Sequence, residues 1–172
     1  MERWGADLYG DPCGGCGFEW STTTEQAIEL VRQLPSRCRA LLHDRTGSEL
    51  HPDLGWTVSG YVSHIVDNLR IWAERSAGAR LGGATEVSGY DPDLIGRGRR
   101  YNDVALAGAL WSLEHASREW VESITAALEA DVVLVHADRG RQTAADVARN
   151  NAHDGFHHIW DIERTLGAVD TE

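Results

Sequence analysis

The 172-residue chain contains no lysine, and all sixteen of its basic residues are arginine. Because lysine codons are AT-rich, this absence suggests a GC-rich host. Positive charge is also scarce: 27 acidic residues give a formal net charge of −11. Such a charge argues against electrostatic binding to nucleic acid or to an anionic membrane. We therefore expect neither a nucleic acid nor a membrane as a partner.

Long hydrophobic runs are missing as well. No apolar run approaches the roughly 20 residues that span a bilayer, and no basic start followed by an apolar stretch indicates a signal peptide. The three cysteines are an odd number, which argues against a disulfide framework in a chain without an export signal. Without a predicted span or signal peptide, we expect a cytoplasmic protein. Its 42% hydrophobic residues are enough for a substantial core.

Apolar residues recur at helical spacing in four stretches. The expected helices end before residue 47, near 77, near 128 and at 167. Their caps are Thr22 with Glu25, Thr57, Asn102 or Asp103, and Thr143 with Asp146. Pro35 should kink or split the first helix. Residues 78–100 read as a long Gly-rich connection, and 132–135 as a short β-like run. An all-α four-helix bundle is the natural architecture.

The first 21 residues form an atypical arm. Proline and four close glycines, at positions 10, 14, 15 and 17, exclude regular structure from the loop DPCGGCG at 11–17. Aromatic residues are expected to hold the arm against the body of the protein: Trp4, Tyr9, Phe18 and Trp20. We therefore divide the chain into an irregular N-terminal arm with a CxxC loop, residues 1–21, and a four-helix domain, residues 22–172.

Cys13 and Cys16 have the spacing of one zinc knuckle, in which glycine lets backbone N–H groups approach the sulfurs. A tetrahedral site needs two more ligands, and no second cysteine pair exists. His43 or His51 have no support beyond nearness in sequence. Three interpretations stay open: a tight turn with free thiols, a second metal site, and a redox or reactive pair. Cys38 lies on a helical stripe and is expected to be a buried thiol.

The last helix carries a stronger metal signal. His153 and His157 lie one turn apart on one face, so both imidazoles can reach one divalent ion. With eight histidines in the chain, chance also produces such pairs. His64 borders the apolar face of the second helix, and a third imidazole there would complete a three-His site. Such a site leaves one coordination position open, as catalytic zinc sites do, and it is this site that predicts a small-molecule substrate as the partner.

Other polar residues near this pair are alternative ligands or hydrogen-bond partners of the ligands. Asp154, His158 and Asp161 fall in this class. A metal-bound histidine usually donates its other N–H to a carboxylate, carbonyl or water. Asp67, Asp161 and Glu163 could each accept that bond, and the sequence does not choose between them.

Three segments carry a family resemblance: LPSR at 34–37, GWTVSGYVSH at 55–64 and HDGFHHIWDIER at 153–164. Together they resemble the DinB-like (DinB/YfiT) metal-binding superfamily over residues 22–167. The resemblance implies a four-helix bundle, often a homodimer, with one zinc or nickel ion. Carried over by position, its ligands are His64, His153 and His157. The CxxC loop departs from the family pattern.

The superfamily includes thiol-dependent transferases and isomerases as well as proposed hydrolases. The resemblance therefore implies a metal-dependent enzyme that activates a low-molecular-weight thiol for transfer to an electrophile. Mycothiol is the natural thiol if the GC-rich host is an actinobacterium. One alternative is a hydrolase that uses metal-bound hydroxide. The other is a non-catalytic metal-binding protein with a role in stress or dimerisation. Family analogy alone ranks thiol transfer slightly above hydrolysis.

Overall fold

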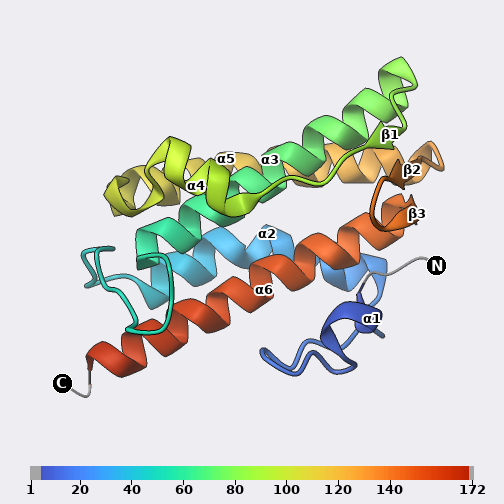
Figure 1. Ribbon diagram of the computed structural model, residues 1–172. Coiled ribbons are helices and arrows are strands. Elements are labelled where there is room, and N and C mark those ends of the chain that lie inside the picture. The colour runs from blue at the N-terminus through green and yellow to red at the C-terminus, as the bar shows by residue number, and fades with distance from the viewer. Residues whose placement is uncertain (1–4, 171–172) are drawn as a thin grey trace.

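Four long helices lie side by side and form the body of the molecule (Figure 1). The computed structural model describes residues 5–170. The long helices are α2 (Thr24–Leu41), α3 (Val58–Gly82), α5 (Leu106–Glu129) and α6 (Ala144–Val169). Helix α3 packs against α5 and α6, and α2 packs against the same two partners. The predicted four-helix bundle is confirmed.

The bundle encloses one hydrophobic core, to which all four long helices contribute. Trp120 and Ile65 are among its largest fully buried side chains. Burying such side chains stabilises the fold by about 1.5–3 kcal/mol each. Cys38 is fully buried, as expected, and burial raises the pKa of its thiol to about 12. Helix α2 runs through Pro35 without being split in two.

Side-chain caps explain where three of the long helices begin. Thr57 caps α3, as predicted, and Thr143 forms the predicted capping box with Asp146 at α6. At α2 the capping box is shifted by one residue, from Thr22 to Thr23, whose partner is Gln26. Gln26 Oε1 accepts a hydrogen bond from the Thr23 N–H at 2.9 Å, whereas the Thr22 hydroxyl donates to the Glu19 carbonyl instead.

The start of α5 differs from the prediction. Asn102 or Asp103 was the expected cap, but residues Tyr101–Asp103 form the short 3-10 helix η1 and α5 begins at Leu106. The Asn102 side chain is used elsewhere, because its Oδ1 accepts a hydrogen bond from the Thr57 N–H at 2.9 Å. This bond ties the turn before α5 to the start of α3.

The connection between α3 and α5 has more structure than its glycine content indicates. It holds strand β1 (Glu86–Val87) and helix α4 (Pro92–Arg99). Asp91 caps α4 and Pro92 occupies its first turn, a standard helix start. Strand β1 pairs in parallel with β2 (Val133–His136), which pairs antiparallel with β3 (Gly140–Thr143). The small sheet lies at one end of the bundle (Figure 1).

The N-terminal arm lies alongside α6 (Figure 1). It contains the one-turn helix α1 (Ala6–Tyr9) followed by the cysteine loop. Three arm aromatics surround one α6 side chain: the rings of Tyr9, Trp20 and Phe18 lie 4.6, 4.8 and 5.4 Å from that of His153. These contacts agree with the prediction that aromatic residues hold the arm against the body of the protein. Trp4, the fourth, lies outside the described residues.

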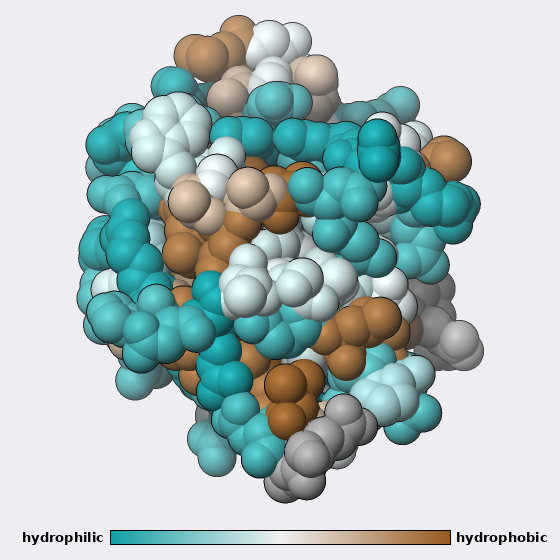
Figure 2. All heavy atoms as spheres, turned by 90° about the vertical axis from the view of Figure 1, so that its left-hand side faces the viewer, coloured by the Kyte–Doolittle hydropathy of each residue, from teal (hydrophilic) through white to brown (hydrophobic). Residues whose placement is uncertain are grey.

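The surface fits the acidic composition. The end of the bundle shown in Figure 2 is mostly hydrophilic, with scattered hydrophobic patches between the polar side chains. In residues 5–170, no helix combines the length and apolar character needed to cross a membrane.

Candidate metal centre

Two neighbouring stripes of α6 carry all its candidate ligands. His153 and His157 are four residues apart, and so are Asp154 and His158. Residues four apart lie one above the other on a helix, whereas adjacent residues point about 100° apart. The first pair therefore faces the N-terminal arm, and the second pair faces α3. This one-residue stagger decides which other side chains each pair meets.

The second pair meets His64 of α3. His64 Nε2 lies 3.6 Å and His158 Nε2 3.7 Å from the same carboxylate oxygen, Asp154 Oδ1. One ligand atom from each residue falls within 4.8 Å of the other two. We call these three residues the histidine–aspartate group. Two imidazoles and one carboxylate are a common ligand set for a divalent transition metal.

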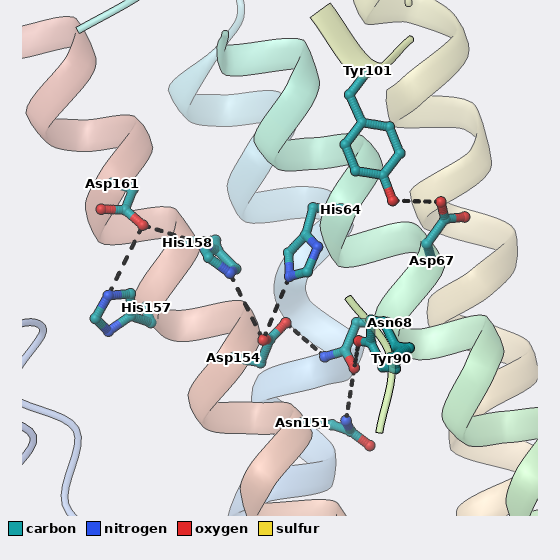
Figure 3. A network of polar contacts seen from close by, with 10 residues as sticks. All are labelled: His64, Asp67, Asn68, Tyr90, Tyr101, Asn151, Asp154, His157, His158 and Asp161. Atoms are coloured by element: carbon teal, nitrogen blue, oxygen red, sulfur yellow. Dashed lines mark hydrogen bonds and ion pairs between the residues drawn. The ribbon is translucent and has the colours of Figure 1, made fainter. Parts of the chain in front are cut away.

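Further hydrogen bonds orient this group (Figure 3). His158 Nδ1 lies 3.0 Å from Asp161 Oδ2, which leaves Nε2 facing Asp154. Asn68 Nδ2 donates to Asp154 Oδ2 at 2.6 Å, and Asn68 Oδ1 accepts from the Tyr90 hydroxyl at 3.0 Å. A carboxylate behind a ligand histidine fixes its tautomer and raises its basicity. Asp161 is therefore placed to serve His158 in this way.

Charge within the group is balanced locally. Burial alone would raise the pKa of Asp154, but the His64 and His158 imidazoles outweigh it and hold that pKa well below its usual range. Burial likewise would lower the pKa of His64, but the Asp154 carboxylate outweighs it and raises that pKa. Asp154 is thus ionised at neutral pH, the form in which a carboxylate binds metal.

The histidine–aspartate group lines a pocket of about 430 Å³. Aromatic side chains form part of its wall, including Trp56, Trp72 and Tyr90. Arg75 and Arg139 bring positive charge to the same pocket. The pocket is large enough for a small-molecule substrate.

Asp67, predicted as a partner of the ligands, has other contacts. Its Oδ2 accepts a hydrogen bond from the Tyr101 hydroxyl at 2.6 Å, and its Oδ1 pairs with Arg99. The carboxylate therefore links α3 to η1 and α4. Glu163, also considered from sequence, pairs instead with Arg37 at the surface.

The first α6 pair meets the cysteine loop of the arm. Cys13, Cys16, His153 and His157 each place one ligand atom within 4.8 Å of those of the other three. We call these residues the cysteine–histidine group. Cys13 Sγ lies 3.8 Å from His157 Nδ1, across 144 residues of sequence. Burial lowers the pKa of His153 to about 4 and also lowers that of His157. Both imidazoles are thus neutral, the form that binds metal.

The structure therefore divides the three ligands predicted from sequence. His64 joins Asp154 and His158, whereas His153 and His157 join the two cysteines. His158, expected to support the ligands, instead lies in the ligand position beside His64. Sequence spacing could not separate these outcomes, because both α6 pairs have a spacing of four. Which residues bind an ion stays a prediction for both groups.

Comparison with known proteins adds information on the fold. No family model and no curated protein matches the chain. Among solved structures, the chain is similar to YfiT from Bacillus subtilis, described as "a probable metal-dependent hydrolase with an unusual four-helix bundle topology". The two share 20% identity over 84% of this chain and 87% of that one, with a TM-score of 0.68. The resemblance predicted from sequence is thus confirmed for the fold.

Proposed function

We propose that the protein is a metal-dependent hydrolase of small molecules, with the histidine–aspartate group as its catalytic metal site. The observation that carries the proposal is that these three ligands converge beside a pocket of about 430 Å³. Three protein ligands beside open space are typical of catalytic sites, whereas structural sites are closed by four. The description of the fold neighbour as a probable hydrolase supports the same choice.

A divalent cation held here would act as a Lewis acid and lower the pKa of a coordinated water. The protein's own residues set the conditions for this. Asp161 holds the ring of His158, and Asn68 holds the carboxylate of Asp154. Because the group itself carries one carboxylate, a bound dication would keep net positive charge within the group. That charge favours a polarised carbonyl or an anionic leaving group in the pocket.

The pocket walls indicate what kind of substrate fits. Arg75 stacks over Trp72 and Tyr90, with its guanidinium carbon 4.8 and 5.6 Å from the ring centroids. Its buried Nη1 has no hydrogen-bond partner within the described part of the chain. Asn150 Nδ2, also beside the pocket, is likewise buried without a partner in residues 5–170. These donors favour a substrate that carries a carboxylate or another anionic group.

A panel of small esters and amides, with and without a carboxylate, tests the proposal. Metal-loaded protein in ¹⁸O-labelled water is expected to hydrolyse the anionic members and to place ¹⁸O in the new acid. Asp154→Asn should abolish this rate, because it removes the charged ligand. Glu163→Gln is the matched control, since Glu163 lies on α6 but pairs with Arg37 at the surface. A rate that is the same for Asp154→Asn and for the wild type would count against the site.

Thiol transfer is the alternative that family analogy ranks slightly higher. The same panel distinguishes thiol transfer from hydrolysis, because reaction with a low-molecular-weight thiol forms a thioether or thioester without ¹⁸O. Metal-loaded protein would be incubated with mycothiol, or with several other thiols, and an electrophile. Thiol adducts that depend on Asp154, together with no hydrolysis, would replace hydrolysis by transfer at the same site.

A further inference from the structure

The cysteine loop resembles a metal-binding knuckle in its backbone. Backbone N–H groups lie near both sulfurs and favour their thiolate form: those of Gly15 and Cys16 act on Cys13, and that of Phe18 acts on Cys16. Gly17 adopts a φ of +76°, a left-handed conformation that suits glycine, and its N–H bonds to the Cys13 carbonyl at 2.9 Å. Donors of this kind stabilise thiolates, the form in which cysteine binds metal.

A bound divalent cation would deprotonate both sulfurs, because cysteine binds metal as the thiolate. Both cysteines are free, so no disulfide competes for them in this structure.

The α6 side of the group has an unused ligand atom. His153 is 5% exposed, and its Nε2 is buried with no hydrogen-bond partner in the described residues. Such a nitrogen is costly to bury unless something else binds it. The rings of Tyr9, Phe18 and Trp20 surround it, so water has little access.

The loop also approaches α6 more closely than a larger residue would allow. A Cβ built at Gly15 would lie 3.0 Å from His157 Cε1 and 3.4 Å from Trp160 Cζ3. Gly15 therefore lets the loop backbone pack directly against His157. The two halves of the group are thus held at contact distance, with the four ligand atoms within 4.8 Å of one another.

We propose that the cysteine–histidine group binds one divalent cation of the zinc type as a closed structural site, with all four side chains as ligands. Two thiolates balance the charge of a dication, so the bound site is neutral and suited to burial. Two sulfurs and two imidazole nitrogens are an established zinc set. The cation joins residue 13 to residue 157 and so fastens the N-terminal arm to α6.

The site also supports the neighbouring pocket. Tyr9 of the arm and His153 of the group both line the pocket that holds the histidine–aspartate group. Fastening the arm therefore fixes one wall of that pocket. The closed site does not depend on catalysis at the histidine–aspartate group, and each can be tested without the other.

Cobalt substitution tests the site directly. Reduced, metal-free protein is titrated with Co²⁺, and the thiolate-to-cobalt charge-transfer absorption is followed. This absorption reports the cysteine–histidine group alone, because the histidine–aspartate group contains no sulfur. We expect it to reach a plateau at no more than about two added cobalt ions per chain, because the histidine–aspartate group can take the second ion. It should disappear in a variant carrying Cys13→Ser and Cys16→Ser. Absent absorption in the wild type, or absorption retained in the double variant, overturns the proposal.

Two control variants keep the outcome specific. Asp154→Asn should retain the full thiolate absorption while losing cobalt at the other group. Cys38→Ala, which removes the third cysteine from the core, should also retain it. Loss of the absorption in Asp154→Asn would mean that Cys13 and Cys16 are not an independent site.

A second measurement uses the wild type and so does not depend on the folding of variants. Zinc-loaded and chelator-treated samples are alkylated, and modified peptides are quantified by mass spectrometry. We expect zinc to slow alkylation of Cys13 and Cys16 by about tenfold or more, because the metal occupies both thiolates. Cys38 is the internal reference. Equal alkylation with and without zinc, or a Cys13–Cys16 disulfide in freshly purified protein, overturns the site.

Discussion

The two groups take their α6 ligands from adjacent stripes of one helix, yet their surroundings differ. The histidine–aspartate group has three candidate ligands and borders a pocket of about 430 Å³. The cysteine–histidine group has four candidate ligands, and arm aromatics surround one of them, His153. Open three-ligand sites are typical of catalysis, and closed four-ligand sites of structure. If both proposals hold, one helix serves both purposes through a stagger of one residue.

Charge separates the groups as well. With two thiolates, the cysteine–histidine group would neutralise a dication by itself. With one carboxylate, the histidine–aspartate group would leave positive charge to be met by substrate or solvent. The pocket side also carries Arg75 and Arg139. We therefore expect loss of ligands to affect activity at the first group and stability at the second.

The largest expected effect is on catalysis at the open group. Asp154→Asn should lower kcat/KM about a thousandfold or more at matched protein concentration. Loss of a charged ligand removes several kcal/mol of transition-state stabilisation, and each 1.4 kcal/mol is worth tenfold. Circular dichroism should remain that of the folded protein. More than a tenth of the wild-type activity in this variant would contradict the assignment.

The next effect is on stability at the closed group. A chelator should lower the melting temperature of the wild type by about 10 °C, because bound metal adds about 4 kcal/mol at a thousandfold excess over its Kd. In Cys13→Ser most of this shift should vanish, since the metal no longer binds there. In Asp154→Asn the shift should persist. Differential scanning calorimetry measures all three, and an undiminished shift in Cys13→Ser would contradict the comparison.

The sequence predicts the long helices but not every connection between them. The long helices followed from apolar spacing and from caps such as Thr57 and Thr143, because those signals are local. Helix α4 was missed inside a Gly-rich segment, although Asp91 followed by Pro92 is a local start signal that could have found it. The predicted cap of α5 was wrong because the Asn102 side chain bonds to Thr57 instead, a contact across 45 residues.

The candidate site was predictable in its elements but not in its pairing. The segments of α3, α6 and the cysteine loop that carry the candidate ligands were all singled out from sequence. Their grouping depends on which α6 stripe faces α3 and which faces the arm. The arm aromatics pack on His153, a long-range contact without a local signature in the sequence. From sequence, Asp154 and His158 were only alternative ligands or hydrogen-bond partners of the ligands.

A smaller effect is expected behind the open group. Asp161→Asn should weaken metal binding or lower kcat/KM by about 10–100-fold, because the variant loses the carboxylate that holds His158 Nδ1. Asp67→Asn is the matched comparison, since Asp67 contacts Tyr101 and Arg99 instead. Isothermal titration of metal into both variants should show the loss for Asp161→Asn alone. Equal losses would mean that both carboxylates act on the site.

The smallest expected effect concerns the helix that both groups share. A Cβ at Gly155 would lie 2.6 Å from Leu34 Cδ1 of α2, whereas one at Gly167 meets no atom within 4 Å. Gly155→Ala should therefore lower the free energy of unfolding by about 1–3 kcal/mol through overpacking. Gly167→Ala should raise it by up to about 1 kcal/mol through helix propensity. Urea denaturation measures both.

Because Gly155 lies between the ligands of the two groups on α6, its substitution also tests whether they respond together. A shift of α6 away from α2 should weaken cobalt binding at both groups, whereas Gly167→Ala should leave both unchanged. If Gly155→Ala affects only the thiolate absorption, the open group is held by α3 rather than by the position of α6. If it affects neither, Leu34 adjusts locally and the shared helix transmits no strain between the sites.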